Sequence, residues 1–179
     1  GFSFNVPVQE AVDAFEPGDL RQGVTILDID AWADTTGATY STGNEHTGYF
    51  NRKYIPRTRS SNALLDLNLT NPNNYRAIRY ADVLLMAAEA NNRGGLNESK
   101  AQDYLNQVRR RAFGDELHDV TASVLSLTNA IYLERRLELV GEGHRFFDLV
   151  RTGKAAQEIN GFQEGKHELF PIPAIEIQL

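Results

Sequence analysis

Residues 75–93 read YRAIRYADVLLMAAEANNR, and this stretch indicates the fold of the chain more clearly than any other. Apolar residues recur along it at the spacing of one helical face: Ile78, Ala81, Leu85 and Ala88. Two glycines at 94–95 then end the pattern. Because Asn97 can cap a helix that begins directly afterwards, the sequence predicts a tight helical hairpin.

Two further helical patterns follow residue 97. The second helix of the hairpin carries a regular apolar stripe and ends at Gly114: Ala101, Tyr104, Leu105, Val108 and Ala112. Its small and large residues alternate loosely as in the second helix of a tetratricopeptide repeat. A third helical region is expected from about residue 126 to residue 151, interrupted by Gly141 and Gly143. The chain after it contains Pro171 and Pro173, which predict an extended segment.

The beginning of the chain is rich in turns and polar residues. A short helix is expected at residues 8–15, a short strand at 24–27 and an extended segment at 49–55. Residues 33–48 are almost all Thr, Gly, Ser, Asn or acidic, which predicts a long polar loop of a kind that often carries function.

These patterns together predict an all-α, mainly helical fold, with tetratricopeptide-like hairpins and a loop-rich region that carries short strands. We expect one continuous domain in two parts. Residues 1–74 form the loop-rich segment, and residues 75–179 form the helical region.

Composition excludes several functions. The chain of 179 residues has a net charge of −6, which does not suit a non-specific nucleic-acid binder. It contains no cysteine, which excludes disulfides, zinc ribbons and thiol catalysis. No stretch approaches the roughly 20 consecutive apolar residues of a membrane-spanning helix.

Acidic residues recur every four positions in the third helical region, at Glu134, Glu138 and Glu142, with His144 close by. A carboxylate-bridged di-iron bundle needs Glu-x-x-His on two helices, whereas this chain has Glu-x-His once among several arginines. We therefore predict no metal and no cofactor. The prediction is instead a structural ion-pair network formed by Glu138, Glu142, Arg145, Asp148 and Arg151.

No catalytic residues are predicted. No order of Ser, His and Asp stands out, and no glycine-rich phosphate loop with a lysine is present. A glycosidase needs two carboxylates across a cleft, which the abundant acids permit but do not single out. Asp28 and Asp30 would share one side of a strand, which is typical of a solvated face. The basic run Arg109–Arg111 fits the last turn of a helix, where cations complement the helix dipole.

Aromatic residues gather around the polar loop. Sugars stack their C–H faces on aromatic rings, and polar side chains bond their hydroxyl groups. We therefore predict a ligand-binding set made of Trp32, which is the only tryptophan, with Tyr40, Tyr49 and Asn44. The alternative is that these rings anchor loops to the core.

Several motifs in order resemble the SusD/RagB family. They cover nearly the whole chain: PVQE (7–10), GDLR (18–21), RYADVLLM (79–86) with AEA (88–90), LNQVR (105–109), ERRLEL (134–139) with EGHRFFDL (142–149) and RTG (151–153), and PIP (171–173). The resemblance implies a mostly helical fold with tetratricopeptide-like hairpins around a loop-rich ligand-binding region. It also implies that the helix at 134–139 is part of the structural scaffold rather than of the binding site.

The resemblance further implies a cell-surface lipoprotein of the Bacteroidetes outer membrane. Such proteins bind glycans, or in some cases peptides, and deliver them to a SusC-like TonB-dependent transporter without catalysis. Relatives begin with a lipidated cysteine, so we expect a membrane anchor outside this chain and a chain that is incomplete at both ends. No nucleic acid partner is implied.

Two other functions remain open from the sequence. A helical-repeat scaffold would bind protein rather than sugar, through a groove lined by helix faces. A fragment of a glycoside hydrolase would turn over a polysaccharide. The family's ligand residues lie in variable loops, so no motif transfers them to positions in this chain.

Overall fold

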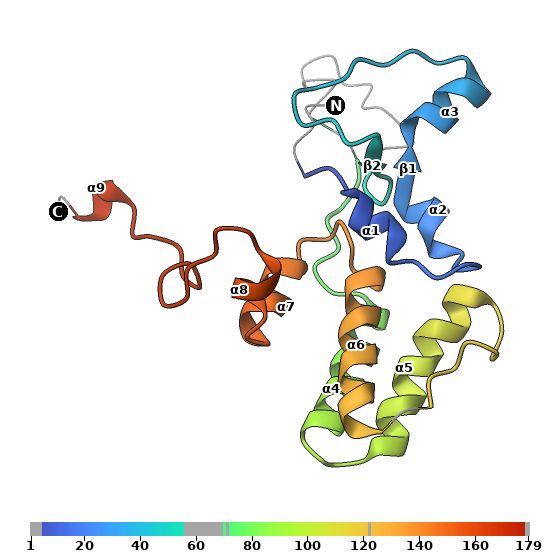
Figure 1. Ribbon diagram of the computed structural model, residues 1–179, viewed down its shortest axis with the longest axis vertical. Coiled ribbons are helices and arrows are strands. Elements are labelled where there is room, and N and C mark those ends of the chain that lie inside the picture. The colour runs from blue at the N-terminus through green and yellow to red at the C-terminus, as the bar shows by residue number, and fades with distance from the viewer. Residues whose placement is uncertain (1–4, 56–69, 71, 122, 178–179) are drawn as a thin grey trace. The chain divides into compact units, whose positions relative to one another are not determined.

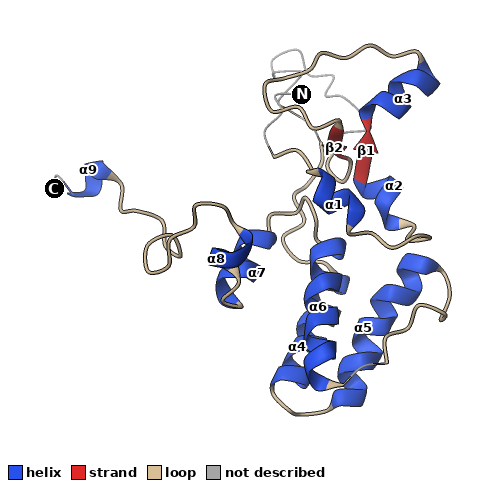
Figure 2. Cartoon of the chain, in the orientation of Figure 1, coloured by secondary structure: helices blue, strands red, loops and turns tan. Residues whose placement is uncertain are grey.

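The computed structural model describes residues 5–55, 70, 72–121 and 123–177. These residues are mostly helical, with one small sheet of two strands, as Figure 2 shows. They form two compact units, 1–141 and 142–179, which are described in turn. The mainly helical prediction is confirmed.

The first unit contains six helices and both strands within its described residues (Figure 1). Their bounds in chain order are α1 (Gln9–Asp13), α2 (Arg21–Thr25), β1 (Ile26–Asp28), α3 (Ile29–Thr36), β2 (Tyr49–Asn51), α4 (Tyr80–Arg93), α5 (Glu98–Phe113) and α6 (Val124–Glu138).

The main core lies between α4, α5 and α6. It consists of small and branched apolar side chains from all three helices: Leu84, Leu85, Ala88, Ala101, Leu105, Val108, Leu127 and Ile131. The hairpin of α4 and α5 forms as predicted. Asn97 caps α5 by accepting a hydrogen bond from the Lys100 amide at 2.9 Å, and Gly114 ends α5 in the left-handed conformation.

Helix α4 begins at Tyr80, five residues later than the sequence pattern predicts. Arg79 is extended, with φ −120° and ψ 157°, and its guanidinium donates to the Glu138 carboxylate at 2.8 Å. The preceding Ile78 is 68% exposed rather than part of the apolar stripe. The ion pair therefore holds this segment outside the helix, against the apolar periodicity of the sequence.

Strands β1 and β2 pair antiparallel, with Ile26 opposite Asn51 and Asp28 opposite Tyr49. The expected strand at 24–27 is shifted, because helix α2 extends to Thr25. Helix α3 begins directly after β1, so the expected polar loop at 33–48 starts only after α3 ends. Asp28 therefore ends a strand while Asp30 lies in a helix, and the prediction that both lie on one strand is wrong.

A buried network of charges joins the beginning of the chain to α5 and α6. The Arg21 guanidinium contacts the carboxylates of Asp19, Glu134 and Glu138. On the other side of Glu134, its second oxygen accepts from Arg109 at 3.0 Å. Because Glu134 and Glu138 are buried almost completely, they need these arginines as partners.

The basic run at the end of α5 takes part in this network. Arg109 also contacts Glu16, and Arg111 contacts Glu138 at 2.7 Å. Specific ion pairs thus explain why arginines stand at positions 109 and 111, in addition to the helix-dipole effect expected from the sequence. Of the five residues predicted as an ion-pair network, Glu138 alone lies in this first unit.

The second unit contains α7 (Arg145–Arg151), α8 (Ala155–Glu158) and α9 (Ala174–Ile177). Arg151 donates to Asp148 at 2.6 Å, the spacing expected for an i, i+3 pair, and Arg145 contacts Glu158 at 3.2 Å. Glu142 is buried. Among the described residues, no helix has the length and apolar character needed to cross a bilayer.

Candidate functional site

Helix α3 presents Trp32 to solvent. The Asp28 carboxylate accepts from the Ala31 amide at 3.0 Å and caps the start of the helix, and Gly37 ends it with φ 69°. Ile29, the first residue of the helix, is buried within the first unit. Trp32 itself is 41% exposed, so a large ring stands on a short helix that is capped and held at its start.

The loop after α3 returns to the start of the same helix. The Ile29 amide donates to the carbonyl of Gly48 at 3.0 Å, which closes the loop at its end. The hydroxyl of Thr47 donates to the Pro7 carbonyl at 2.6 Å. The loop is thus held at its base, as in compact functional loops.

Three rings form a row on this loop and on β2. The His46 ring lies between Tyr40 and Phe50, with ring centroids 5.7 Å and 5.9 Å away. Tyr40 is 37% exposed, and its hydroxyl donates to the Asp30 carboxylate. That hydrogen bond raises the pKa of Tyr40, and the carboxylates of Asp28 and Asp34 add to the effect.

Trp32 and Tyr40 lie on different sides of α3. Tyr40 contacts Asp30, and Trp32 follows Asp30 by two residues, which is about 200° around a helix. The structure therefore presents the two predicted rings as two separate surfaces, not as one flat platform. A ligand that contacts both must wrap around this short helix.

Tyr49 and Asn44 have different environments. The Tyr49 ring packs against the small core cluster that includes Phe15, Ile26 and Leu137, and its hydroxyl hydrogen-bonds Gln9 at 3.0 Å. This arrangement fits the alternative in which a ring anchors a loop to the core. Asn44 is exposed within the loop.

The structure adds His46, which sequence reasoning missed, and Phe50, which belongs to the aromatic group around the loop but not to the predicted ligand set. His46 and Phe50 complete the row of rings with Tyr40. The signal in the sequence was the aromatic composition of residues 40–50, but Tyr40 and His46 lie outside any helix or strand, so no regular pattern places them. Only the closed loop brings them together.

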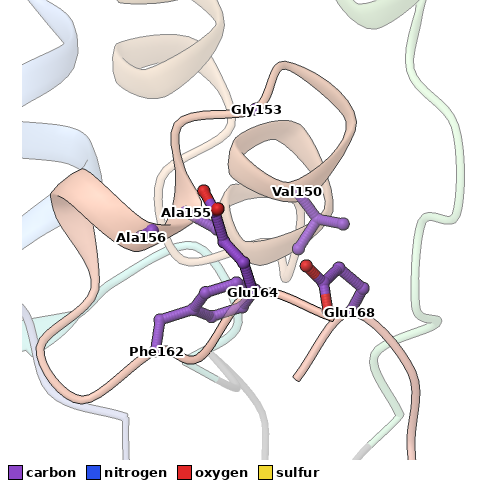
Figure 3. A pocket seen from close by; sticks show the side chains of 7 residues that line it. All are labelled: Val150, Gly153, Ala155, Ala156, Phe162, Glu164 and Glu168. Atoms are coloured by element: carbon purple, nitrogen blue, oxygen red, sulfur yellow. The ribbon is translucent and has the colours of Figure 1, made fainter. Parts of the chain in front are cut away.

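The second unit contains a hollow of about 180 Å³. Figure 3 shows the ring of Phe162 and the carboxylates of Glu164 and Glu168 around it. A backbone hydrogen bond from Gly165 lowers the pKa of Glu168. The volume of the hollow is below the roughly 300–1,000 Å³ that is typical of small-molecule sites. None of the predicted ligand residues lines it.

No group of three or more metal-ligating side chains is found within the described ranges. The sequence raised Glu134 and Glu138 as possible metal ligands. In the structure both carboxylates contact arginines. The arrangement of described residues around Trp32 and Tyr40 offers stacking surfaces and hydrogen-bonding groups, which suits reversible binding of a polar ligand.

Residues 25–177 match the model of the SusD family, and the chain belongs to this family. It is 29% identical over 201 residues to SusD-like protein P2 of Formosa agariphila, across 99% of this chain and 38% of that protein. It is 33% identical over 153 residues to SusD-like protein P38 of the same organism, across 69% of this chain and 30% of that protein.

The fold also matches a solved protein. The similar chain is surface glycan-binding protein A from Bacteroides thetaiotaomicron, with a TM-score of 0.77 and 32% sequence identity. A structure of that protein in complex with laminarihexaose matches with a TM-score of 0.76. Each match covers 95% of this chain and 38% of the solved chain. The chain therefore spans between 30% and 38% of the length of these relatives.

Proposed function

We propose that the protein binds glycans through stacking and hydrogen bonds, without catalysis. The observation that carries the proposal is the half-exposed Trp32 on a helix whose start is capped by Asp28 and held by the loop at Gly48. The complex of a structural relative with laminarihexaose supports it. In this site Trp32 and Tyr40 contact sugar rings, Asn44 contacts hydroxyl groups, and Tyr49 supports the loop from below.

Calorimetric titration with a panel of hexasaccharides tests this function. The panel contains laminarihexaose, cellohexaose, maltohexaose and mannohexaose. We expect one of them to bind, and Trp32→Ala to weaken its binding by about 1–3 kcal/mol, the size of one aromatic stacking contact. Phe147→Ala removes a similarly exposed ring from the second unit and serves as the control.

A surface glycan-binding protein serves nutrient uptake only if its ligand reaches a transporter. We infer that the protein is anchored at the outer-membrane surface by a lipid outside this chain and delivers glycan to a SusC-like TonB-dependent transporter. Membership of the SusD family supports this inference. Purification of the protein from gently solubilised membranes tests it, because the transporter should copurify in a constant ratio.

Two alternatives give different results in the same experiments. A peptide binder would bind an oligopeptide library and no hexasaccharide. A helical-repeat scaffold would retain its protein partner after Trp32→Ala and would bind neither class of small ligand.

A further inference from the structure

A second aromatic surface lies apart from α3, where the segment before α4 meets the segment after β2. The rings of Tyr54 and Tyr75 are stacked, with centroids 5.8 Å apart and planes inclined by 21°. Tyr75 is 67% exposed. The Arg76 guanidinium carbon lies 5.0 Å from the centre of the Tyr54 ring, within the distance of a cation–π contact.

The stack is held by hydrogen bonds to the backbone beneath it. Arg76 donates to the Lys53 carbonyl at 3.2 Å, and Asn73 donates to the Tyr54 carbonyl at 3.4 Å. Together with the Arg79–Glu138 ion pair, these contacts hold residues 75–79 outside helix α4. A ring that is already ordered loses little conformational entropy when a ligand stacks on it.

Arg76 differs from the arginines of the buried network in its electrostatic environment. Arg21, Arg79 and Arg109 each contact carboxylates. Arg76 is exposed and has no carboxylate partner among the residues that the structure describes. A guanidinium has five N–H donors, and the one contact to the Lys53 carbonyl leaves most of them available.

We propose that Tyr75 and Arg76 together bind an acidic sugar unit, a pyranose that carries a carboxylate or a sulfate. The exposed ring of Tyr75 stacks on the face of the sugar, and Arg76 pairs with its anionic group in a charge-assisted hydrogen bond. The positive charge matters because the chain as a whole has a net charge of −6, which repels anions elsewhere. This inference rests on the proposed glycan binding and names a ligand class for it.

The experiment compares three probes on the intact protein by calorimetry: hexagalacturonate, a sulfated galactan hexasaccharide and neutral laminarihexaose. We expect at least one acidic probe to bind, and more weakly as salt rises. Arg76→Gln should lower the affinity for that probe by about tenfold, while the affinity for neutral laminarihexaose should stay within about twofold. Tyr75→Ala should lower the affinity for the acidic probe by a similar factor. The carboxylated and sulfated arms decide which anion the site prefers.

Two matched variants control for general effects. Tyr80→Ala removes a tyrosine that is 74% exposed at the start of α4, and Arg93→Gln removes an arginine that pairs with Glu89. Neither should change the affinity for an acidic probe. Circular dichroism checks that each variant keeps the helical content of the parent protein.

The outcomes separate this inference from the proposed function. If neutral laminarihexaose binds and neither acidic probe does, the inference is wrong and the proposed function stands. The same holds if an acidic probe binds equally well to Arg76→Gln and to the parent protein. If no glycan from this set or from the neutral panel binds, both the inference and the proposed function fail.

Discussion

The side chain of Asn51 holds the backbone of Gly141 at the end of the first unit. Its amide donates to the Gly141 carbonyl at 2.8 Å, and its oxygen accepts from the Lys53 amide at 3.0 Å. Asn51 belongs to β2, the strand that also carries Tyr49 and Phe50. The end of α6 and the base of the candidate glycan site are therefore joined directly.

Gly141→Ala should destabilise the first unit by about 2–4 kcal/mol. Gly141 has φ +75°, where a residue with a Cβ is strained, and that Cβ would lie 2.4 Å from the Asn51 side-chain nitrogen. The new methyl group must push Asn51 out of both its hydrogen bonds. Urea unfolding measures the free energy of unfolding for this variant.

Gly95→Ala provides the control for Gly141→Ala. Gly95 has φ +61°, but no atom lies within 4 Å of the place that the alanine methyl group would take, so only the backbone strain of about 1–2 kcal/mol applies. Equal destabilisation of the two variants would mean that the contact with Asn51 does not matter.

Glu138 should stabilise the fold in a pH-dependent way. Burial alone would raise the pKa of this carboxyl, but hydrogen bonds from Arg111, Arg79 and Arg21 outweigh burial and lower the pKa to about 2. A lowered carboxyl pKa stabilises the folded state above the unfolded value of about 4.5, and the stabilisation is lost as the pH falls toward 2. The full effect is about 3 kcal/mol.

The difference in unfolding free energy between the parent protein and Glu138→Gln isolates this effect. We expect the difference to be large at neutral pH and to shrink steadily below about pH 4. The pH dependence of the parent protein alone does not isolate Glu138. Burial raises the pKa of neighbouring Glu134, so that residue also makes the unfolding free energy depend on pH. Glu116→Gln, which removes an exposed partner of Arg110, should cost no more than about 1 kcal/mol at any pH. A difference for Glu138→Gln that does not depend on pH would contradict the assignment.

Asp28→Ala should loosen the helix that carries Trp32. The substitution removes the cap on the Ala31 amide and should cost about 1 kcal/mol of stability. Asp28→Ser keeps an acceptor oxygen at that position and should recover most of the loss. Denaturant unfolding followed by Trp32 fluorescence reads this helix directly, since Trp32 is the only tryptophan. No difference between the Ala and Ser variants would show that the cap is unimportant.

The helical hairpin was predictable because its signals are local. The apolar stripe of α5, the cap at Asn97 and the glycine at 114 lie within one short stretch of sequence, and all three act as expected. The start of α4 was not predictable, because Arg79 is held extended by Glu138, 59 residues away. Periodicity cannot detect an ion pair between distant segments.

The candidate site was predictable only in part, for the same reason. The aromatic composition around the polar loop pointed to Trp32 and Tyr40, and both are exposed. The sequence did not show that α3 separates them, because the polar residues 34–36 at the end of α3 resemble the start of the polar loop predicted at 33–48. Nor did it show that His46 lies between two other rings, since loop closure at Gly48 decides that.

Trp32 fluorescence during titration with the hexasaccharide panel tests glycan binding at α3 most directly. If a sugar stacks on Trp32, its emission should shift to shorter wavelength in a saturable way, with the same Kd that calorimetry gives. Saturable binding by calorimetry with unchanged Trp32 emission would contradict a site at α3.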